Sequence, residues 1–382
     1  MNYTQTHIKK NSTVITLSAF ILPQSIKEYQ VIIEGTDKSL SYDEQLSHLL
    51  ETFNNLRNKE LKDTSVVMVR YFLSDAANQQ EQLEKQMNKD DGAISIIQQP
   101  PLNGTKIALW AYLPTGMEVR TDSDGLTEAK HGSYTHYWKG SATATAENSE
   151  KQTFLLLNEY DKMLQKRHCK IEDNCIRTWF FVQDIDVNYA GLVKARNEVF
   201  LSHQLTNMTH YIASTGIGGK NACPQQSVQM DTYAINGIHK EQIQYLYAKS
   251  NLSSTYTYGV SFERGTCIKY GDRRHVIISG TASIDNKGNV MWIGNIRKQA
   301  LRVLENVEAL LLEGNCTLDD LGYAFIYLRD TADYAVVKTL YDKYLPNVPK
   351  IIVLAPVCRA QWLIEIECMA IKKDRNIIFK EY

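Results

Sequence analysis

The sequence predicts an α+β protein that contains three copies of one folding unit, and three observations lead to this prediction. Its 382 residues suffice for two or three domains, and 43% of them are hydrophobic. Three apolar runs end in aspartate, namely VVMVRYFLSD (66–75), CIRTWFFVQD (175–184) and YAFIYLRD (323–330). A glutamine precedes these aspartates by 30, 32 and 31 residues, at Gln45, Gln152 and Gln299. A repeat at near-constant spacing indicates tandem structural units.

The elements of each copy follow in one order. The strand that directly precedes the first helix closes on glycine, around Gly35, Gly140 and Gly280. A segment with helical periodicity follows, at 42–56, 152–164 and 297–312. The apolar run is then a buried strand, and its aspartate opens a second helix because a carboxylate near a helix start accepts free amide hydrogens. A last strand completes the copy, at 106–113, 228–235 and 361–371.

These elements define a unit of strand, strand, helix, strand, helix, strand, in which two helices cover one sheet. The predicted domains are 1–118, 119–250 and 251–382, and the N-terminal residues form a first strand. A polar, glycine-bearing stretch at 115–132 separates the first two domains. The second connection, 236–254, is expected to contain a short helix, EQIQYLYAK, and a serine-rich turn.

The third copy resembles the reactive-intermediate deaminase (Rid or YjgF) family, often labelled endoribonuclease L-PSP. The resemblance lies at HVIISGTASID, RKQALRVLENVEALL and LIEIECMA, covers residues 255–373, and is weaker but ordered in the other copies. Members of that family are homotrimers with ligand pockets between adjacent subunits. The resemblance therefore implies three Rid-like domains in an intramolecular pseudo-trimer, with an inner barrel of sheets, outer helices and a monomeric chain.

Within this superfamily, four segments resemble the chorismatase group, which hydrolyses or rearranges chorismate. They are RTWFF (177–181), STGIGG (214–219), YGVSFERG (258–265) and VCRAQWLIEIE (357–367). The sequence departs from the group in its three clear copies and in a YGP-type segment reduced to Tyr258-Gly259-Val260. The first copy has no assignable counterpart in the group and is expected to be structural.

Composition argues against several classes of function. Lys plus Arg number 42 against 43 Asp plus Glu, so there is no global positive field to attract nucleic acid. No apolar run approaches the roughly 20 residues that span a bilayer. Seven scattered cysteines without a CxxC pair and nine dispersed histidines predict reduced thiols, no metal site and no cofactor. The N-terminus lacks a cleavable signal pattern, and we expect a cytoplasmic protein.

Two acids stand out within the last apolar strand. Glu365 and Glu367 lie two residues apart, so they point to one face, where burial of a carboxylate is costly without a partner or a function. The first copy has Trp110 and Tyr112 at the matched offsets, and the second has Asp231 and Tyr233. The resemblance implies that Glu365 is the active-site acid, with a raised pKa that suits general-acid catalysis. The alternative is a salt bridge to a neighbouring copy.

Cys358 and Arg359 precede Glu365 by seven and six residues, and one of them is expected to reach the same pocket. In chorismatase-type sites a cysteine at this position takes part in product choice, whereas a lone cysteine is otherwise a small apolar residue. Arg359, Arg264 and Arg177 are candidates for holding substrate carboxylates in bidentate fashion. Each could instead form a structural ion pair.

The STGIGG segment is expected to be a loop after a strand. Its glycines let backbone amides approach a ligand anion, which makes Thr215, Gly216 and Gly218 candidate substrate-binding residues. The segment lacks the spacing of a Walker or dinucleotide loop, and a tight structural turn is the alternative.

These residues favour a chorismatase-like enzyme that attacks the enol ether of chorismate or a related small carboxylate by general-acid catalysis. Imine or enamine deamination is an alternative. That activity uses an arginine about 15 residues before the acid in the family, where this chain has Lys350, and the corresponding residue of the first copy is Ser95. Lysine lacks the bidentate fork of arginine. A non-catalytic metabolite-binding protein is a third possibility.

Overall fold

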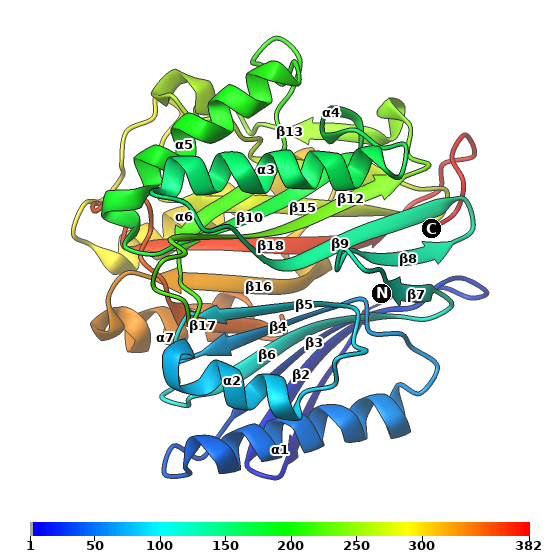
Figure 1. Cartoon of the computed structure of the whole chain (residues 1–382), viewed down its shortest axis with the longest axis vertical. Helices are drawn as coiled ribbons and strands as arrows, with labels where there is room; N and C mark the ends of the chain where they lie inside the picture. The colour runs from blue at the N-terminus through cyan, green and yellow to red at the C-terminus, as the bar shows by residue number, and fades with distance from the viewer. Residues whose placement is uncertain (1–2) are drawn as a thin grey trace.

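Each third of the chain folds into a six-stranded mixed sheet with helices on one face. The computed structural model describes residues 3–382 (Figure 1). The first copy comprises β1 (Tyr3–Lys10), β2 (Thr13–Phe20), β3 (Glu28–Gly35), α1 (Tyr42–Asn55), a π-helical turn η1 (Leu56–Glu60), β4 (Met68–Leu73), α2 (Ala76–Gln86), β5 (Ala93–Gln98) and β6 (Ile107–Pro114). Its strands lie in the order β1-β2-β3-β6-β4-β5, and only β4 and β5 are parallel neighbours.

The other two copies repeat this topology. The second contains β7 (Glu118–Thr121), β8 (Thr127–His131), β9 (Tyr134–Thr143), α3 (Ser149–Gln165), α4 (Ile171–Asn174), β10 (Cys175–Val182), α5 (Ile185–Ser202), β11 (Ala213–Gly218) and β12 (Val228–Asn236). The third contains β13 (Ile243–Leu246), β14 (Gly265–Lys269), β15 (Arg273–Ala282), α6 (Ile296–Glu313), β16 (Leu321–Leu328), α7 (Tyr334–Tyr344), β17 (Lys350–Leu354) and β18 (Ile364–Lys373). Short 3-10 turns lie between them: η2 (Lys240–Gln242), η3 (Thr255–Tyr258), η4 (Leu318–Asp320) and η5 (Thr331–Asp333).

The predicted fold class is confirmed, but each sheet has two strands more than the predicted unit. One is the first strand of each copy, and the other is the parallel edge strand β5, β11 or β17. The STGIGG segment forms β11 rather than the expected loop, since it pairs with β10 from Ala213 to Gly218. The expected helix in EQIQYLYAK is also wrong, because Ile243–Leu246 is a strand that pairs with β14. The third sheet thus begins before the predicted domain start at 251.

The three repeated glutamines perform the same structural task. Each side-chain oxygen accepts a hydrogen bond from a backbone amide at the start of the last strand of its copy. Gln45 bonds Lys106 N at 2.8 Å, Gln152 bonds Val228 N at 3.1 Å, and Gln299 bonds Leu363 N at 2.9 Å. These bonds tie the first helix of each copy to its sheet, which explains the recurring offset.

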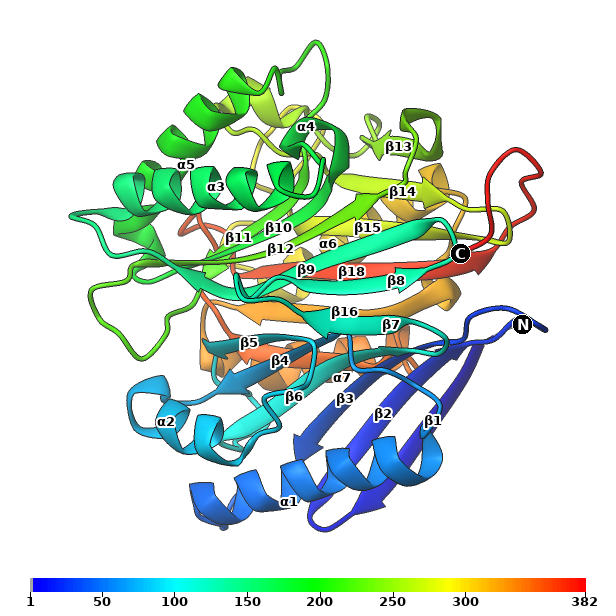
Figure 2. The same ribbon diagram turned by 45° about the vertical axis from the view of Figure 1, so that its right-hand side comes forward.

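The three sheets face one another at the centre of the molecule, and the helices lie on the outside (Figures 1 and 2). Aromatic side chains pack between the copies. Trp110 of β6 lies 5.0 Å from the ring of Tyr323 and 5.4 Å from that of Phe325, both on β16. Tyr112 lies 6.2 Å from Trp138 on β9. The chain therefore forms the predicted pseudo-trimer. None of the helices in the described residues 3–382 is both long and apolar enough to cross a membrane.

A buried row of charges crosses the centre. Arg70 of the first copy donates to Asp231 of the second at 2.8 Å and lies 3.8 Å from Glu367 of the third. Arg177 of the second copy donates to the same Glu367 at 2.8 Å. All four side chains are at most 1% exposed, so two cations and two anions neutralise each other out of water.

Candidate active site

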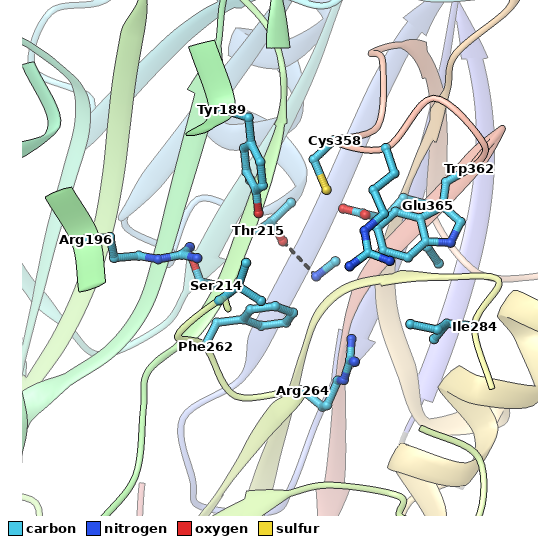
Figure 3. Close-up of a pocket in the computed structure, with 15 residues that line it drawn as sticks. Tyr189, Arg196, Ser214, Thr215, Phe262, Arg264, Ile284, Cys358, Trp362 and Glu365 are labelled. Carbon is cyan, nitrogen blue, oxygen red and sulfur yellow. Dashed lines mark hydrogen bonds between the residues drawn. The ribbon is translucent and has the colours of Figure 1, made fainter. Parts of the chain in front are cut away.

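A cavity beside this row of charges lies between the second and third copies (Figure 3). The second copy contributes β11 and α5, and the third contributes β15, β18 and the segment 355–363 that joins β17 to β18. Isolated bridges from Ala213 to Glu263 and from Ile217 to Val357 hold β11 against the third copy. Six of the predicted site residues line the cavity, namely Thr215, Gly216, Arg264, Cys358, Arg359 and Glu365.

Glu365 lies in the middle of the third sheet, where its neighbours across the strands are Ala282 of β15 and Tyr327 of β16. Its carboxyl group rests against Gly280, since a Cβ at that glycine would lie 2.1 Å from Glu365 Oε1. Burial, together with the nearby Glu367, raises the pKa of Glu365 to about 8, although Arg177 and Arg264 oppose the shift. At neutral pH this side chain is a carboxylic acid that can donate a proton.

The adjacent charges explain why Glu365 stays neutral. Arg70 pairs with Asp231 and Glu367, and Arg177 pairs with Glu367, so neither cation is devoted to Glu365. The Thr215 hydroxyl stands between this row and the cavity, where it accepts hydrogen bonds from Arg177 Nη2 and, at 2.9 Å, from Gly280 N. The buried ion pairs therefore use the carboxyl groups of Asp231 and Glu367, and Glu365 takes no part in them.

Two predicted substrate-binding residues lie outside the cavity. Arg177 is held by Glu367 and Thr215 and packs its guanidinium 4.9 Å from the Trp179 ring centre. Gly218 ends β11, where its amide donates to Pro356 O and its carbonyl accepts from Gln99 Nε2. The polar groups of Gly218 and Nη2 of Arg177 thus bind other parts of the protein, whereas Nε and Nη1 of Arg177 are buried without a hydrogen-bond partner among the described residues.

Three guanidinium groups line the cavity. Arg264 donates from Nε and Nη2 to Ser253 O at 3.3 and 3.0 Å, and Arg359 lies 4.7 Å from the Trp362 ring centre. The third, Arg196 of α5, was not predicted. It is 1% exposed, and its Nε and Nη2 have no hydrogen-bond partner among the described residues. Buried, unsatisfied donors that line a cavity are suited to an anionic ligand.

Cys358 lies in the segment before β18, and Figure 3 shows its sulfur pointing into the same space as the Glu365 carboxyl. Burial, together with the nearby Glu365, raises the pKa of the Cys358 thiol to about 12. The group is therefore a neutral thiol at physiological pH. It can shape the cavity or donate a weak hydrogen bond, but it is not poised as a thiolate nucleophile.

The sequence also gave no indication of the apolar walls. Tyr189, Phe262, Ile284 and Trp362 surround the polar groups (Figure 3). Gly216 allows the ring of Tyr189 to approach, because a Cβ there would lie 2.9 Å from Tyr189 Cε2. The cavity holds about 50 Å³.

The strand register corrects the matched offsets. Ala108 and Gln229 pair with Phe72 and Phe181 as Glu365 pairs with Tyr327, so Trp110 and Asp231 are the counterparts of Glu367 and neither other copy has an acid at the position of Glu365. Asp231 binds Arg70, and it also accepts from Ser141 N at 2.8 Å. Trp110 donates from Nε1 to Gln30 at 3.0 Å and packs against the third copy. The expected asymmetry of the three interfaces is thus visible in which residues fill them.

Comparisons with known proteins agree with this architecture. Residues 267–372 match the family model described as Endoribonuclease L-PSP. A RutC family protein of Saccharolobus solfataricus is 37% identical over 107 residues, which are 28% of this chain and 83% of that protein. The chain belongs to this RutC, or Rid-like, family. The 3-aminoacrylate deaminase RutC of Acinetobacter baylyi is 32% identical over 72 residues, or 19% of this chain and 57% of that enzyme.

A solved structure extends the comparison beyond the third copy. A chorismatase crystal structure superposes with a TM-score of 0.64 and covers 80% of this chain and 93% of its own. The two sequences are 16% identical, so the likeness concerns the fold. The chain is a Rid-like protein with a chorismatase-related fold.

Proposed function

We propose that the protein is a chorismatase-like enzyme that acts on chorismate or a related small carboxylate, with Glu365 as the general acid. The observation that carries this proposal is a neutral, buried carboxylic acid in a cavity lined by Arg196, Arg264 and Arg359. Guanidinium groups bind carboxylates in bidentate fashion, and a carboxylic acid with a pKa near the working pH is an effective proton donor.

The proposed reaction begins with protonation of the enol-ether methylene by Glu365. The C=C electron pair forms the new C–H bond, and the positive charge is shared by the former vinyl carbon and the ether oxygen as an oxocarbenium ion. Water attacks that carbon, its proton returns to the Glu365 carboxylate, and the hemiketal collapses to pyruvate and a ring alcohol. Capture by a ring hydroxyl would give a rearranged product instead.

The arginines have the task of orientation in this proposal. Two carboxylates held by guanidinium groups would fix the methylene toward Glu365 and counter the charge of the substrate, which otherwise would disfavour its burial. Thr215 and Gly216 form the wall opposite β18, and Cys358 borders the acid. The position of the thiol suits a group that decides which nucleophile reaches the oxocarbenium ion.

Incubation with chorismate followed by mass spectrometry tests the proposal. Release of pyruvate, or formation of an isomeric benzoate, is the expected result. Glu365→Gln keeps the shape of the side chain and should reduce turnover at least about a hundredfold, the scale of a positioned acid. Tyr112→Phe, in the first copy, should leave turnover nearly unchanged. Equal loss in both variants, or no product from the wild type, would refute the assignment.

Enamine deamination is the second candidate, favoured by the family relationship to a 3-aminoacrylate deaminase. Lys350 does not line the cavity beside Glu365. Its ammonium donates to Leu345 O at 3.0 Å and pairs with Asp342 at 3.4 Å. Release of ammonia from an enamine substrate without pyruvate formation from chorismate would favour this reaction. Binding of a carboxylate without either product would favour the non-catalytic alternative.

A further inference from the structure

A second, larger cavity lies next to the candidate active site. It holds about 330 Å³ and is formed by the segment after α5, the segment 247–256 and the residues that lead into β14. We call it the outer cavity and define it by His210, Tyr211, Tyr247, Lys249, Ser253 and Glu263. Arg264 lines both cavities, and Phe262 lines only the inner one, so the extended segment 262–264 separates them.

Glu263 is the buried carboxyl group that lines the outer cavity and that could bind a ligand there. Its side chain is 5% exposed, and one carboxyl oxygen accepts from Tyr211 N at 2.8 Å. Burial raises the pKa of Glu263, and the hydrogen bond from Tyr211 N and the charge of Arg264 oppose the shift without cancelling it. The hydroxyl of Ser253, 6% exposed, has no partner among the described residues.

Tyrosine side chains line the same cavity as this carboxyl group. Tyr211, Tyr247 and Tyr256 all border it, and the charge of Glu263 contributes to raising the pKa values of Tyr211 and Tyr247. The ammonium of Lys249 already lies 5.5 Å from the ring centre of Tyr247. A carboxylate among tyrosine rings is the arrangement that recognises an organic cation, through ion pairing and cation–π attraction together.

We propose that the outer cavity binds a small organic ammonium ion, with Glu263 as counter-ion and Tyr211 and Tyr247 as aromatic walls. The ligand could be a plain amine or the ammonium end of an amino acid, since Lys249 and Arg264 could receive a carboxylate. This site is distinct from the acid at Glu365 and does not rest on the function proposed above. Arg264 couples the two, because its charge acts on both Glu263 and Glu365.

Calorimetric titration with three probes of one ring size tests the proposal. Phenethylamine carries only the ammonium, L-phenylalanine carries both charges, and 3-phenylpropionate carries only the carboxylate. The first two should bind the wild-type protein, and the third should not compete with them. Glu263→Gln should weaken amine binding at least about tenfold, as expected for loss of a charged partner. Stronger binding of phenylalanine would identify an amino acid as the ligand, and the reverse order a plain amine.

Control variants distinguish binding in the outer cavity from binding in the inner one. Glu365→Gln should leave amine binding unchanged, which separates this site from the inner cavity whether or not the enzyme turns over chorismate. Should Glu263→Gln fail to fold, Tyr247→Leu and Tyr247→Phe form a matched pair. The leucine variant should bind the amine several-fold more weakly, and the phenylalanine variant should retain binding. No amine binding, binding that survives Glu263→Gln, or binding lost in Glu365→Gln would overturn the proposal.

Discussion

At the scale of single residues, the difference between Glu365 and Glu367 is instructive. The two acids occupy the same face of β18, but Glu367 receives Arg177 Nη2 and Trp179 Nε1, both at 2.8 Å. Glu365 instead lies against the Gly280 backbone and borders the cavity. One strand thus presents one carboxyl group that is held by hydrogen bonds from the second copy and one that faces a cavity.

This difference predicts the pH dependence of turnover. A general acid must be protonated, and the pKa of Glu365 lies at about 8. We expect kcat/KM to stay level as pH rises to about 8 and then to fall tenfold per pH unit. A pH–rate profile measures this, and the residual activity of Glu365→Gln should lack the alkaline limb. An activity that rises through pH 8 would contradict the role of acid.

A second prediction at this scale concerns the effect of replacing Arg196 on stability and on substrate binding. Because Nε and Nη2 are buried without a partner, removal of the guanidinium should leave stability unchanged or slightly improved. Arg196→Met should raise KM for a carboxylate substrate about tenfold or more, as expected for a lost charge-assisted contact. Lys194→Met, on the exposed side of α5, is the control. Unchanged KM in both variants would exclude Arg196 from ligand binding.

Some of the residues that line the cavity could be predicted from the sequence, and others could not. Glu365, Cys358, Arg359 and Arg264 were predictable because they lie close together within recognisable segments of the third copy. Arg196 was not, because it lies on a helix of another copy and nothing in its local pattern separates it from a surface arginine. Arg177 pairs with Glu367 and does not line the cavity, and an inward-pointing arginine on a strand has the same local pattern in either case.

At the scale of elements, the strands adjoining the cavity depend on close backbone approach. Gly280 of β15 lies against the acid, and a methyl group there would overlap Glu365 Oε1. The first helix of each copy was predicted within a few residues because its apolar spacing marks it. The edge strand β11 was not, since STGIGG has the composition of a loop, and only pairing with β10 makes it extended.

Gly280→Ala tests this close approach. The added methyl group should displace the Glu365 carboxyl and reduce turnover by at least about tenfold while the fold remains, since a shift of about 1 Å at a reacting group is costly. Gly219→Ala is the control. Its new methyl group would lie 3.1 to 3.2 Å from the side chains of Ile97 and Phe181 and would not meet Glu365. Comparable activity in the two variants, with matching melting curves, would argue against a precise position for Glu365.

At the scale of the whole molecule, the buried charges link all three copies. Arg70→Met would leave Asp231 and Glu367 short of a cation, at a cost of roughly 3–5 kcal/mol in the free energy of unfolding. Lys85→Met, which removes an exposed pair with Glu81, should cost under about 0.5 kcal/mol. Denaturant titration compares them. A small effect of Arg70→Met would show that the interior is more hydrated than the buried contacts indicate.

The pseudo-trimer also predicts the oligomeric state. Each copy already has two neighbours within the chain, so the surfaces that would otherwise hold separate subunits together are covered. Sedimentation equilibrium should give a mass near 43.6 kDa. A mass near three times that value would show that a further interface exists on the outer surface.

The pair of Arg70 and Asp231 has an evolutionary consequence. In a ring of three identical chains, any substitution appears at all three interfaces at once, so a cation placed in one would be placed in every one. Covalent linkage of the copies removes that constraint. One interface here holds the Arg70–Asp231 salt bridge and another holds Trp110, while Glu365 borders a cavity at the third. Tandem linkage thus lets the three interfaces differ, and selection can act on one of them without changing the other two.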